Sequence, residues 1–384
     1  MRYILITDVQ YRKTFDVISI ILNQFPKEYL LLGSAMSKLF TSVCYGKIET
    51  IKLRTDEGYS VFFEDMETLQ ERYSGCDIVY LPIEETTTDY FVRYMASKVK
   101  HLVKWLYLLP SAELYTLFRN KESLNRFCLL NNLPSPKMYT WTPFCNKNQS
   151  EAWEFPVILK PTIGSGSRGI YRLTRIEDIS PEIILKLNNE SYLIQELIPN
   201  GNQVEGAFFL CEDGEILGAY THERIRTYPE DGGVTVLSRM QYNSDLIEIG
   251  HSLLKQVKWS GLVMLEYLWD EKNHSYKLIE ANPRLWGSVM LSEYGGAYLL
   301  TNYIRRCIGM PLKSMQVDSS KFIRWLFPMD IFNLLRSKFK IHGFWNFKDT
   351  CFINWTYASK YRAIVYMFFN TFNIDNIKKI IYRK

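Results

Sequence analysis

Lys160 ends an apolar run and stands just before a glycine-rich segment, residues 164–169. Glycines let backbone N–H groups turn towards an anion, and Lys160 and Arg168 add positive charge, so this stretch could cover phosphate groups. It is not a Walker A loop, because the lysine precedes the glycines and a second apolar run, instead of a helix, follows them. A flexible hairpin turn is an equally good interpretation of these residues alone.

Two glutamates and an asparagine in residues 262–288 could bind a hard cation. Glu266 and Glu280 lie in two apolar runs joined by a polar turn, and Asn282 follows Glu280 by two positions. In a strand that spacing puts Glu280 and Asn282 on one face, and Glu266 can lie opposite them if the two strands pair. Oxygen ligands without His or Cys suit Mg²⁺ better than zinc, and Arg284 offers a planar fork to a phosphate oxygen. A solvated surface hairpin is the alternative, which the apolar neighbours of both glutamates disfavour.

Residues 192–206 could contact a nucleoside. An apolar strand reaches Gln195, Glu196 and Ile198, whose backbone could bind a purine edge, and a turn then leads to Glu205, whose carboxylate could bind ribose hydroxyls. Taken alone, this segment could also be an ordinary strand end.

The pattern of apolar residues predicts the elements that position these groups. Apolar runs at residues 3–7, 29–33 and 77–82, with a helical pattern at 15–22, favour a parallel α/β sheet at the N-terminus. The first strand is not followed by GxGxxG, so a dinucleotide site is not expected there. A helix should begin near Asn120, and from residue 156 short alternating strands predict antiparallel sheet.

Length and composition predict a folded, multidomain chain. The 384 residues exceed one ordinary domain, and 47% hydrophobic and 23% charged residues exclude a disordered or collagen-like protein. Seven scattered cysteines, without a CxxC pair, indicate reduced thiols, and no apolar run is long enough for a signal peptide or a membrane span. We therefore expect a cytoplasmic protein.

In this order, the three segments resemble the ATP-grasp superfamily of ligases, which includes biotin carboxylase, carbamoyl-phosphate synthetase and D-alanine ligases. The resemblance covers residues 1–315, and residues 280–284 (EANPR) are its most specific part. It implies an α/β and α+β fold, with a Rossmann-like preATP-grasp domain at 1–118. An ATP-grasp domain with central and C-terminal subdomains would follow at 119–315, and residues 316–384 would be an additional basic, aromatic segment.

The resemblance also implies roles for individual residues. Nucleotide binding would fall to Lys121 and Lys160 on the phosphates, Ser165, Gly166, Ser167 and Gly169 in the lid, Gln195, Glu196 and Ile198 in the adenine hinge, and Glu205 on ribose. Metal binding would fall to Glu266, Glu280 and Asn282, and catalysis to Arg284 and Lys160. Residues 221–236 add Arg224 and Arg226 as anchors for the substrate, although this segment could instead be a solvated basic loop.

The activity implied by the resemblance is ligation. With ATP and Mg²⁺ (or Mn²⁺), the enzyme would phosphorylate a small-molecule carboxylate to an acyl phosphate and join it to an amine, releasing ADP and phosphate. Two alternatives stay open: a ligase with a non-amine acceptor, and a non-catalytic nucleotide-binding module associated with a membrane.

The C-terminal residues 321–384 differ from the rest in charge and aromatic content. They carry 12 Lys or Arg and 3 Asp or Glu, a net charge of +9, whereas residues 1–320 carry 34 and 38, a net charge of −4. With 17 Phe, Trp or Tyr among 64 residues, this segment could contact an anionic membrane surface or a lipid-linked acceptor, at the inner face of the membrane. Packing against the ligase body or a second subunit, in a homodimer, is slightly favoured, and nucleic acid is not an expected partner.

Overall fold

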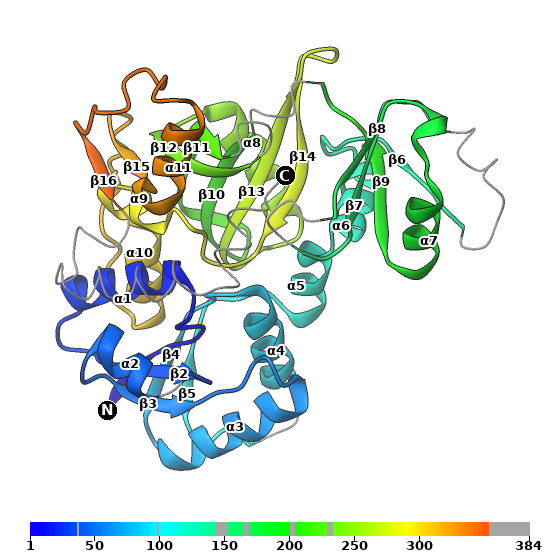
Figure 1. Ribbon diagram of the computed structural model, residues 1–384. Coiled ribbons are helices and arrows are strands. Elements are labelled where there is room, and N and C mark those ends of the chain that lie inside the picture. The colour runs from blue at the N-terminus through cyan, green and yellow to red at the C-terminus, as the bar shows by residue number, and fades with distance from the viewer. Residues whose placement is uncertain are drawn as a thin grey trace.

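The computed structural model describes residues 1–36, 38–97, 100–142, 153–164, 169–199, 204–228 and 233–352 (Figure 1). Within these ranges the strands form three sheets of five, seven and four strands. The five-stranded sheet lies at the bottom of Figure 1, with the seven-stranded sheet above it and the four-stranded sheet to one side.

The N-terminal sheet is parallel, in the order β3-β2-β1-β4-β5. Its strands are β1 (Arg2–Ile6), β2 (Tyr29–Ser34), β3 (Glu49–Lys52), β4 (Asp77–Tyr80) and β5 (Lys104–Leu106), and its helices are α1 (Arg12–Gln24), α2 (Lys38–Tyr45), α3 (Tyr59–Arg72) and α4 (Glu85–Ala96). Alternation along β1 sends Leu5 into a core with α3 and α4, whereas Ile4 and Ile6 pack with α1 on the other face. The three strands and the helix expected near this end of the chain are confirmed.

Two short helices connect this sheet to the rest: α5 (Ala112–Arg119) and α6 (Lys121–Leu130). Asn120 caps α6, because its side chain accepts a hydrogen bond from the backbone N–H of Ser123 at 3.0 Å. The cap places Lys121 in the first turn, where its backbone N–H donates to the carbonyl of Thr162 at 2.9 Å.

The four-stranded sheet is antiparallel, in the order β6-β9-β7-β8. It contains β6 (Met138–Tyr139), β7 (Val157–Pro161), β8 (Tyr171–Leu173) and β9 (Tyr192–Glu196), and α7 (Pro181–Asn189) covers one face. Val157 and Leu159 point into the core under α7, so alternation turns Ile158 and Lys160 to the opposite face.

The seven-stranded sheet has the order β14-β13-β10-β11-β12-β15-β16. Its strands are β10 (Glu205–Glu212), β11 (Glu215–Tyr228), β12 (Val234–Gln241), β13 (Gly261–Asp270), β14 (Ser275–Asn282), β15 (Phe322–Arg324) and β16 (Thr350–Phe352). The helix α8 (Ser244–Gln256) packs on one face, and α9 (Val289–Tyr294) and α10 (Leu299–Cys307) pack on the other. The core under α9 and α10 continues into α1, so one hydrophobic core joins this sheet to the N-terminal sheet.

The basic segment at residues 221–236 is not a solvated loop in its described part. Residues up to Tyr228 extend β11, and β12 begins at Val234, so the two form a long hairpin. The pairing of these strands was not apparent from the sequence.

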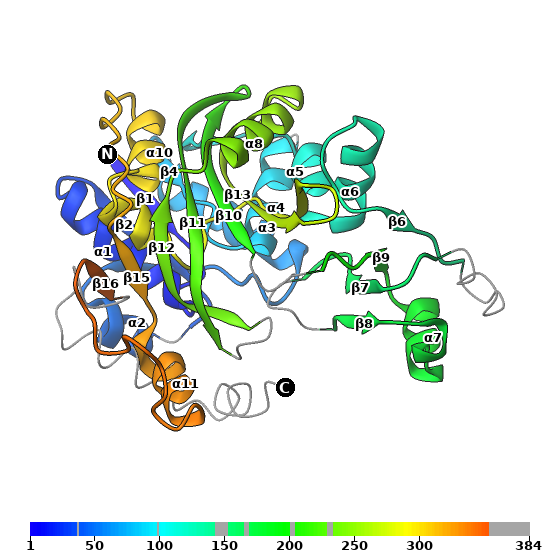
Figure 2. The same ribbon diagram turned by 90° about the horizontal axis from the view of Figure 1, so that it is seen from above.

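The described part of the C-terminal segment belongs to the seven-stranded sheet. The strand β15 pairs antiparallel with β12, and β16 pairs parallel with β15, so the sheet does not end at residue 315 (Figure 2). Between them, α11 (Ile331–Arg336) follows a helical turn that ends at Asp330. In the described ranges, none of the helices combines the length and apolar composition needed to cross a bilayer.

Asp330 ties this segment to the β11–β12 hairpin. Its two carboxylate oxygens accept hydrogen bonds from Nε and Nη2 of Arg226, each at 2.7 Å, and Oδ2 also accepts from Nε of Arg324 at 2.6 Å. Asp330 and Arg324 are 0% and 1% exposed. The guanidinium of Arg324 also lies 4.1 Å from the ring centre of Phe344. The cluster is therefore a buried charge network held by neighbouring aromatic rings.

Replacing Asp330 by Asn should lower the free energy of unfolding by about 3 kcal/mol, because two arginines would lose the charge that compensates them. Urea denaturation of the full chain measures this loss. The matched control is Glu122→Gln, which removes an exposed ion pair to Arg126 and should cost less than about 0.5 kcal/mol. Equal effects of the two substitutions would contradict the prediction.

Candidate active site

A cleft of about 890 Å³ separates the four-stranded sheet from β13 and β14. It gathers most of the side chains that the sequence analysis singled out from five separate segments: Lys121, Lys160, Gln195, Glu196, Ile198, Arg224, Glu266, Glu280, Asn282 and Arg284. The tertiary structure thus brings the predicted phosphate-binding, hinge and metal-binding residues to one place.

Two carboxylates face each other at the base of the cleft. Glu266 on β13 and Glu280 on β14 are cross-strand partners, and Asn282 pairs with Met264 two residues along the same hairpin. Burial raises the pKa of Glu280 to about 7, and the charge of Glu266 adds to the increase, while Lys121 and Lys160 oppose it. The site therefore holds two neighbouring acids whose negative charges repel each other and require nearby cations.

Three cationic side chains surround this pair. Nζ of Lys121 lies 3.6 Å from Oε1 of Glu280, and Nη2 of Arg224 donates to Oε1 of Glu266 at 3.0 Å. Lys160 is 8% exposed, and burial lowers its pKa to about 8 although both glutamates favour its charged form. An anionic ligand would favour the charged form of Lys160 in the same way.

Lys121 also contacts the start of the glycine-rich segment. Its Nζ donates to the carbonyl of Gly164 at 2.6 Å, which joins the first turn of α6 to the loop after β7. Ser165, Gly166 and Ser167 lie outside the described residues. Gly169 is described, and two features of its position favour glycine. Its φ is +70°, and a Cβ there would lie 3.1 Å from Pro161 and from the Tyr192 hydroxyl.

The predicted hinge forms another wall of the cleft. Gln195 is 1% exposed, and its Oε1 has no hydrogen-bond partner in the part of the chain that the structure describes. Glu196 turns its Oε1 to the backbone N–H of Lys137 at 2.8 Å, so its carboxylate is used within the sheet. Ile198 is buried beside them. A buried acceptor without a donor, next to apolar side chains, suits a planar ligand that carries an amino group.

Two of the predicted site residues, Glu205 and Arg226, do not line the cleft. Glu205 lies opposite Tyr267, and its Oε1 accepts from the Tyr276 hydroxyl at 2.9 Å. Alternation along β10 turns Glu205 away from the cleft, which its neighbour Val204 lines. Arg226 is likewise outside the cleft lining, because its guanidinium binds Asp330.

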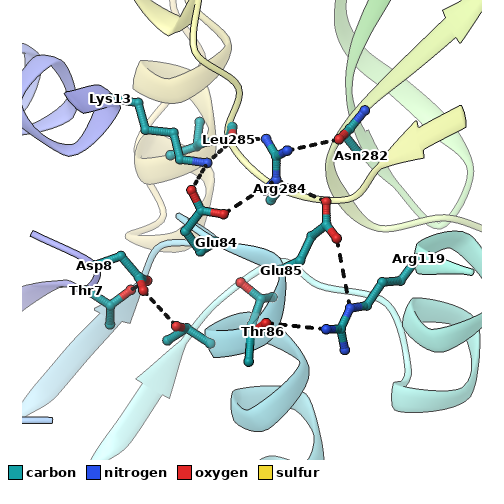
Figure 3. A network of polar contacts seen from close by, with 12 residues as sticks. Thr7, Asp8, Lys13, Glu84, Glu85, Thr86, Arg119, Asn282, Arg284 and Leu285 are labelled. Carbon is teal, nitrogen blue, oxygen red and sulfur yellow. Dashed lines mark hydrogen bonds and ion pairs between the residues drawn. The ribbon is translucent and has the colours of Figure 1, made fainter. Parts of the chain in front are cut away.

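Arg284 joins the cleft to the N-terminal domain (Figure 3). Its Nη2 donates to Oδ1 of Asn282 at 3.0 Å, and its Nε donates to Oε1 of Glu85 at 3.1 Å. Nζ of Lys13 forms an ion pair with Oε1 of Glu84 at 2.8 Å and also donates a hydrogen bond to the carbonyl oxygen of Leu285 at 2.9 Å. The loop after β14 is therefore clamped between acids that follow β4 and a lysine of α1.

Several of these residues were not among those predicted from the sequence. Glu84 and Glu85 follow β4 at the carboxyl edge of a parallel sheet, beside the β1/β4 switch point where such folds gather functional groups, and that position was the available signal. Arg172 lines the cleft because it pairs with Ile158 across β7 and β8, and only the register reveals this.

No family profile matches the sequence, and no curated protein matches it. Solved structures do match. N5-carboxyaminoimidazole synthetase from Staphylococcus aureus is 12% identical, with a TM-score of 0.64 over 89% of this chain and 86% of that one. Biotin carboxylase from Campylobacter jejuni, solved as a β-γ-ATP complex, is 15% identical, with a TM-score of 0.62 over 84% and 74%.

A third match is the biotin carboxylase domain dimer of the Hydrogenobacter thermophilus 2-oxoglutarate carboxylase, in complex with MgADP, ADP and bicarbonate. It is 13% identical, with a TM-score of 0.60 over 84% of this chain and 73% of that one. The chain has the ATP-grasp fold. The mixed α/β and α+β class expected from the sequence is thereby confirmed.

The donor atoms in this cleft suit magnesium. Among the described residues, no group of three or more His, Cys, Asp and Glu side chains could hold a metal ion by itself. Glu266, Glu280 and Asn282 offer two carboxylates and an amide oxygen, and Mg²⁺ binds through one or two carboxylates while phosphates and water complete its shell. The residues therefore fit an ion bound together with a nucleotide.

Asp8 follows β1 by two residues and lies near Glu84 (Figure 3). Its carboxylate accepts hydrogen bonds from the hydroxyls of Thr7 and Thr87 at 2.5 and 2.8 Å, and its φ of 57° suits Asp or Asn. Burial raises the pKa of Asp8 from 3.8 to about 6. The fold therefore favours the neutral carboxyl group.

Replacing Asp8 by Asn should stabilise the protein above pH 6 by up to about 3 kcal/mol and have little effect below pH 4. Because the pKa of Asp8 is raised in the folded state, the wild type loses stability as pH rises from about 4 to about 6, where the Asp8 carboxyl ionises more easily in the unfolded chain than in the folded one. Asn at this position does not ionise, so the variant does not lose this stability. Urea denaturation at pH 4, 5, 6 and 7.5 measures the difference. A difference that does not change with pH would refute this assignment.

Proposed function

We propose that this protein is an ATP-dependent ligase that activates a carboxylate as an acyl phosphate. The observation that carries the proposal is the convergence of Glu266, Glu280 and Asn282 with two buried lysines and Arg284 in one cleft. Phosphoryl transfer relies on positioning and on neutralising charge, and it needs no protein nucleophile. The matched structures with ATP-type ligands support a nucleotide in this cleft.

Each side of the cleft has a distinct part in the proposal. Lys121 and Lys160 bind the phosphates, and the backbone at Glu196 and Ile198 with the free Oε1 of Gln195 binds adenine. Mg²⁺, when bound by Glu266, Glu280 and Asn282, would neutralise phosphate charge. These assignments rest on the placement of the residues around one cavity.

The proposed reaction has two steps, formation of the acyl phosphate and its attack by an amine. A substrate carboxylate oxygen takes the γ-phosphoryl group, and the bond from phosphorus to the bridging oxygen breaks to release ADP. An amine then attacks the acyl carbon, loses a proton, and expels phosphate. In this proposal Arg284 stabilises charge on the transferred group and Arg224 anchors the substrate carboxylate. Arg224 contacts Glu266 and Arg284 contacts Asn282 within the same cleft.

A second form of the proposal has bicarbonate as the activated acid. The Hydrogenobacter thermophilus structure contains bicarbonate with MgADP, and this chain shares its fold. Bicarbonate therefore belongs with amino acids, dipeptides and uronic acids among the acids to be tested.

ADP release from Mg²⁺ and ATP should be stimulated by one of these acids together with an amine, and Glu280→Gln should reduce the stimulated rate by at least about 100-fold. A coupled ADP assay measures the rate. The matched control is Glu271→Gln at the exposed turn of the same hairpin, which should keep the wild-type rate. ATP binding without any stimulated release would favour a non-catalytic nucleotide-binding module.

Lys160→Met should weaken MgADP binding by about 10- to 100-fold, because one charge-assisted contact to phosphate is lost. Titration calorimetry measures the affinity, and Lys272→Met at the exposed hairpin turn is the control. The ligand-free variant should not melt at a lower temperature, since burying the charge of Lys160 is unfavourable. Unchanged affinity would remove Lys160 from the phosphate site.

A further inference from the structure

Residues 331–348 form an exposed surface of aromatic, aliphatic and basic side chains, here called the aromatic–basic patch. Five large apolar side chains on α11 and the loop after it are exposed: Trp345 by 72%, Phe339 by 68%, Leu335 by 51%, Phe347 by 40% and Phe332 by 36%. Phe332 and Leu335 share one side of α11, and the rings of Trp345 and Phe347 are 6.3 Å apart.

The charge of the patch has one sign. Residues 331–348 contain four Lys or Arg and no Asp or Glu. The side chains of Arg336, Lys338, Lys340 and Lys348 are exposed, and none forms an ion pair within the described ranges. The flanking acids are already used, because Asp330 binds two arginines and Asp349 binds Lys321 at 2.7 Å. The patch therefore presents uncompensated positive charge among apolar groups.

The exposed side chains stand on a fixed base. Phe344 is 2% exposed, and its carbonyl accepts from Nη1 of Arg324 at 2.6 Å, while Leu334 is 4% exposed. The neighbours Leu335 and Trp345 consequently point outward. Phe339 has a φ of +65°, a conformation that bulky residues rarely adopt. The fold thus holds apolar side chains in solvent at a conformational cost.

Exposed apolar residues elsewhere are less concentrated. Leu130, Leu185 and Tyr242 are exposed by 77%, 63% and 58% but lie in separate parts of the chain: on α6, on α7 and between β12 and α8. Single exposed apolar residues are ordinary, whereas a cluster surrounded by one sign of charge indicates a binding surface.

We propose that the aromatic–basic patch docks this protein on an anionic membrane surface. Phe339, Trp345 and Leu335 would enter the headgroup region, and the lysines would contact lipid phosphates. The exposed aliphatic side chain of Leu335 in the same segment favours lipid over nucleic acid, which would use aromatic stacking on bases. The patch lies outside the cleft lining, so the proposal does not depend on the ligase activity.

Co-sedimentation of the full chain with vesicles tests the proposal. The wild type should bind phosphatidylcholine vesicles that contain phosphatidylglycerol, bind pure phosphatidylcholine much less, and be released by salt. The double variant Lys338→Gln with Lys340→Gln should lower the partition constant about 30-fold, since each basic residue contributes about fivefold. The double variant Phe339→Ser with Trp345→Ser should lower it at least about tenfold.

Matched controls come from exposed positions elsewhere. Leu130→Ser with Leu185→Ser, and Lys27→Gln with Lys47→Gln, should leave vesicle binding unchanged. Every variant should keep the wild-type melting temperature. Equal binding to both vesicle types, or patch variants that bind like the wild type, would overturn the proposal. Patch-dependent binding of an oligonucleotide but not of vesicles would overturn it in favour of nucleic acid.

Discussion

The rest of the site depends on one electrostatic constraint: two glutamates, Glu266 and Glu280, are held side by side in a cleft where each side chain is only partly exposed. A like-charged pair removed from water is costly unless cations or hydrogen-bond donors surround it. The fold provides these from α6, β7 and β11, as Lys121, Lys160 and Arg224. This arrangement of two acids among three cations is the basis of the proposed site for phosphates together with a metal ion.

Arg284 connects the site of the two glutamates to the N-terminal part of the chain. It contacts Asn282 on one side and Glu85 on the other, while Lys13 and Glu84 clamp the adjacent loop (Figure 3). The β1/β4 switch point, where a free Rossmann-like domain would offer a binding crevice, is thus covered by the loop after β14. The hydrophobic core shared by α1, α9 and α10 holds the two domains at this position.

The C-terminal segment has two different faces. Inward, β15, β16 and Asp330 complete the seven-stranded sheet and fix the hairpin that carries Arg224. In addition, Nδ2 of Asn333 donates to the carbonyl of Thr227, a cleft-lining residue, at 3.1 Å. Outward, α11 and the following loop expose apolar and basic side chains. A segment that the sequence sets apart as an extension is therefore part of the body that supports the cleft.

The sequence by itself determined the elements whose signals are local. Apolar runs predicted β1, β7, β13 and β14, Asn120 predicted the start of α6, and spacing within residues 280–284 predicted that Glu280 and Asn282 share a face. These features depend on the repeat of a strand or on a cap, which neighbouring residues specify.

Only the tertiary structure decided which side chains enter the cleft. Glu205 and Arg226 have suitable chemistry, but strand alternation turns the first away and Asp330 binds the second. Arg172 reaches the cleft through the register of β7 with β8, and Glu85, outside the cleft lining, contacts the lining residue Arg284. Register, long-range strand pairing and the partner of a charge are set by residues far apart in the chain, so local patterns do not contain them.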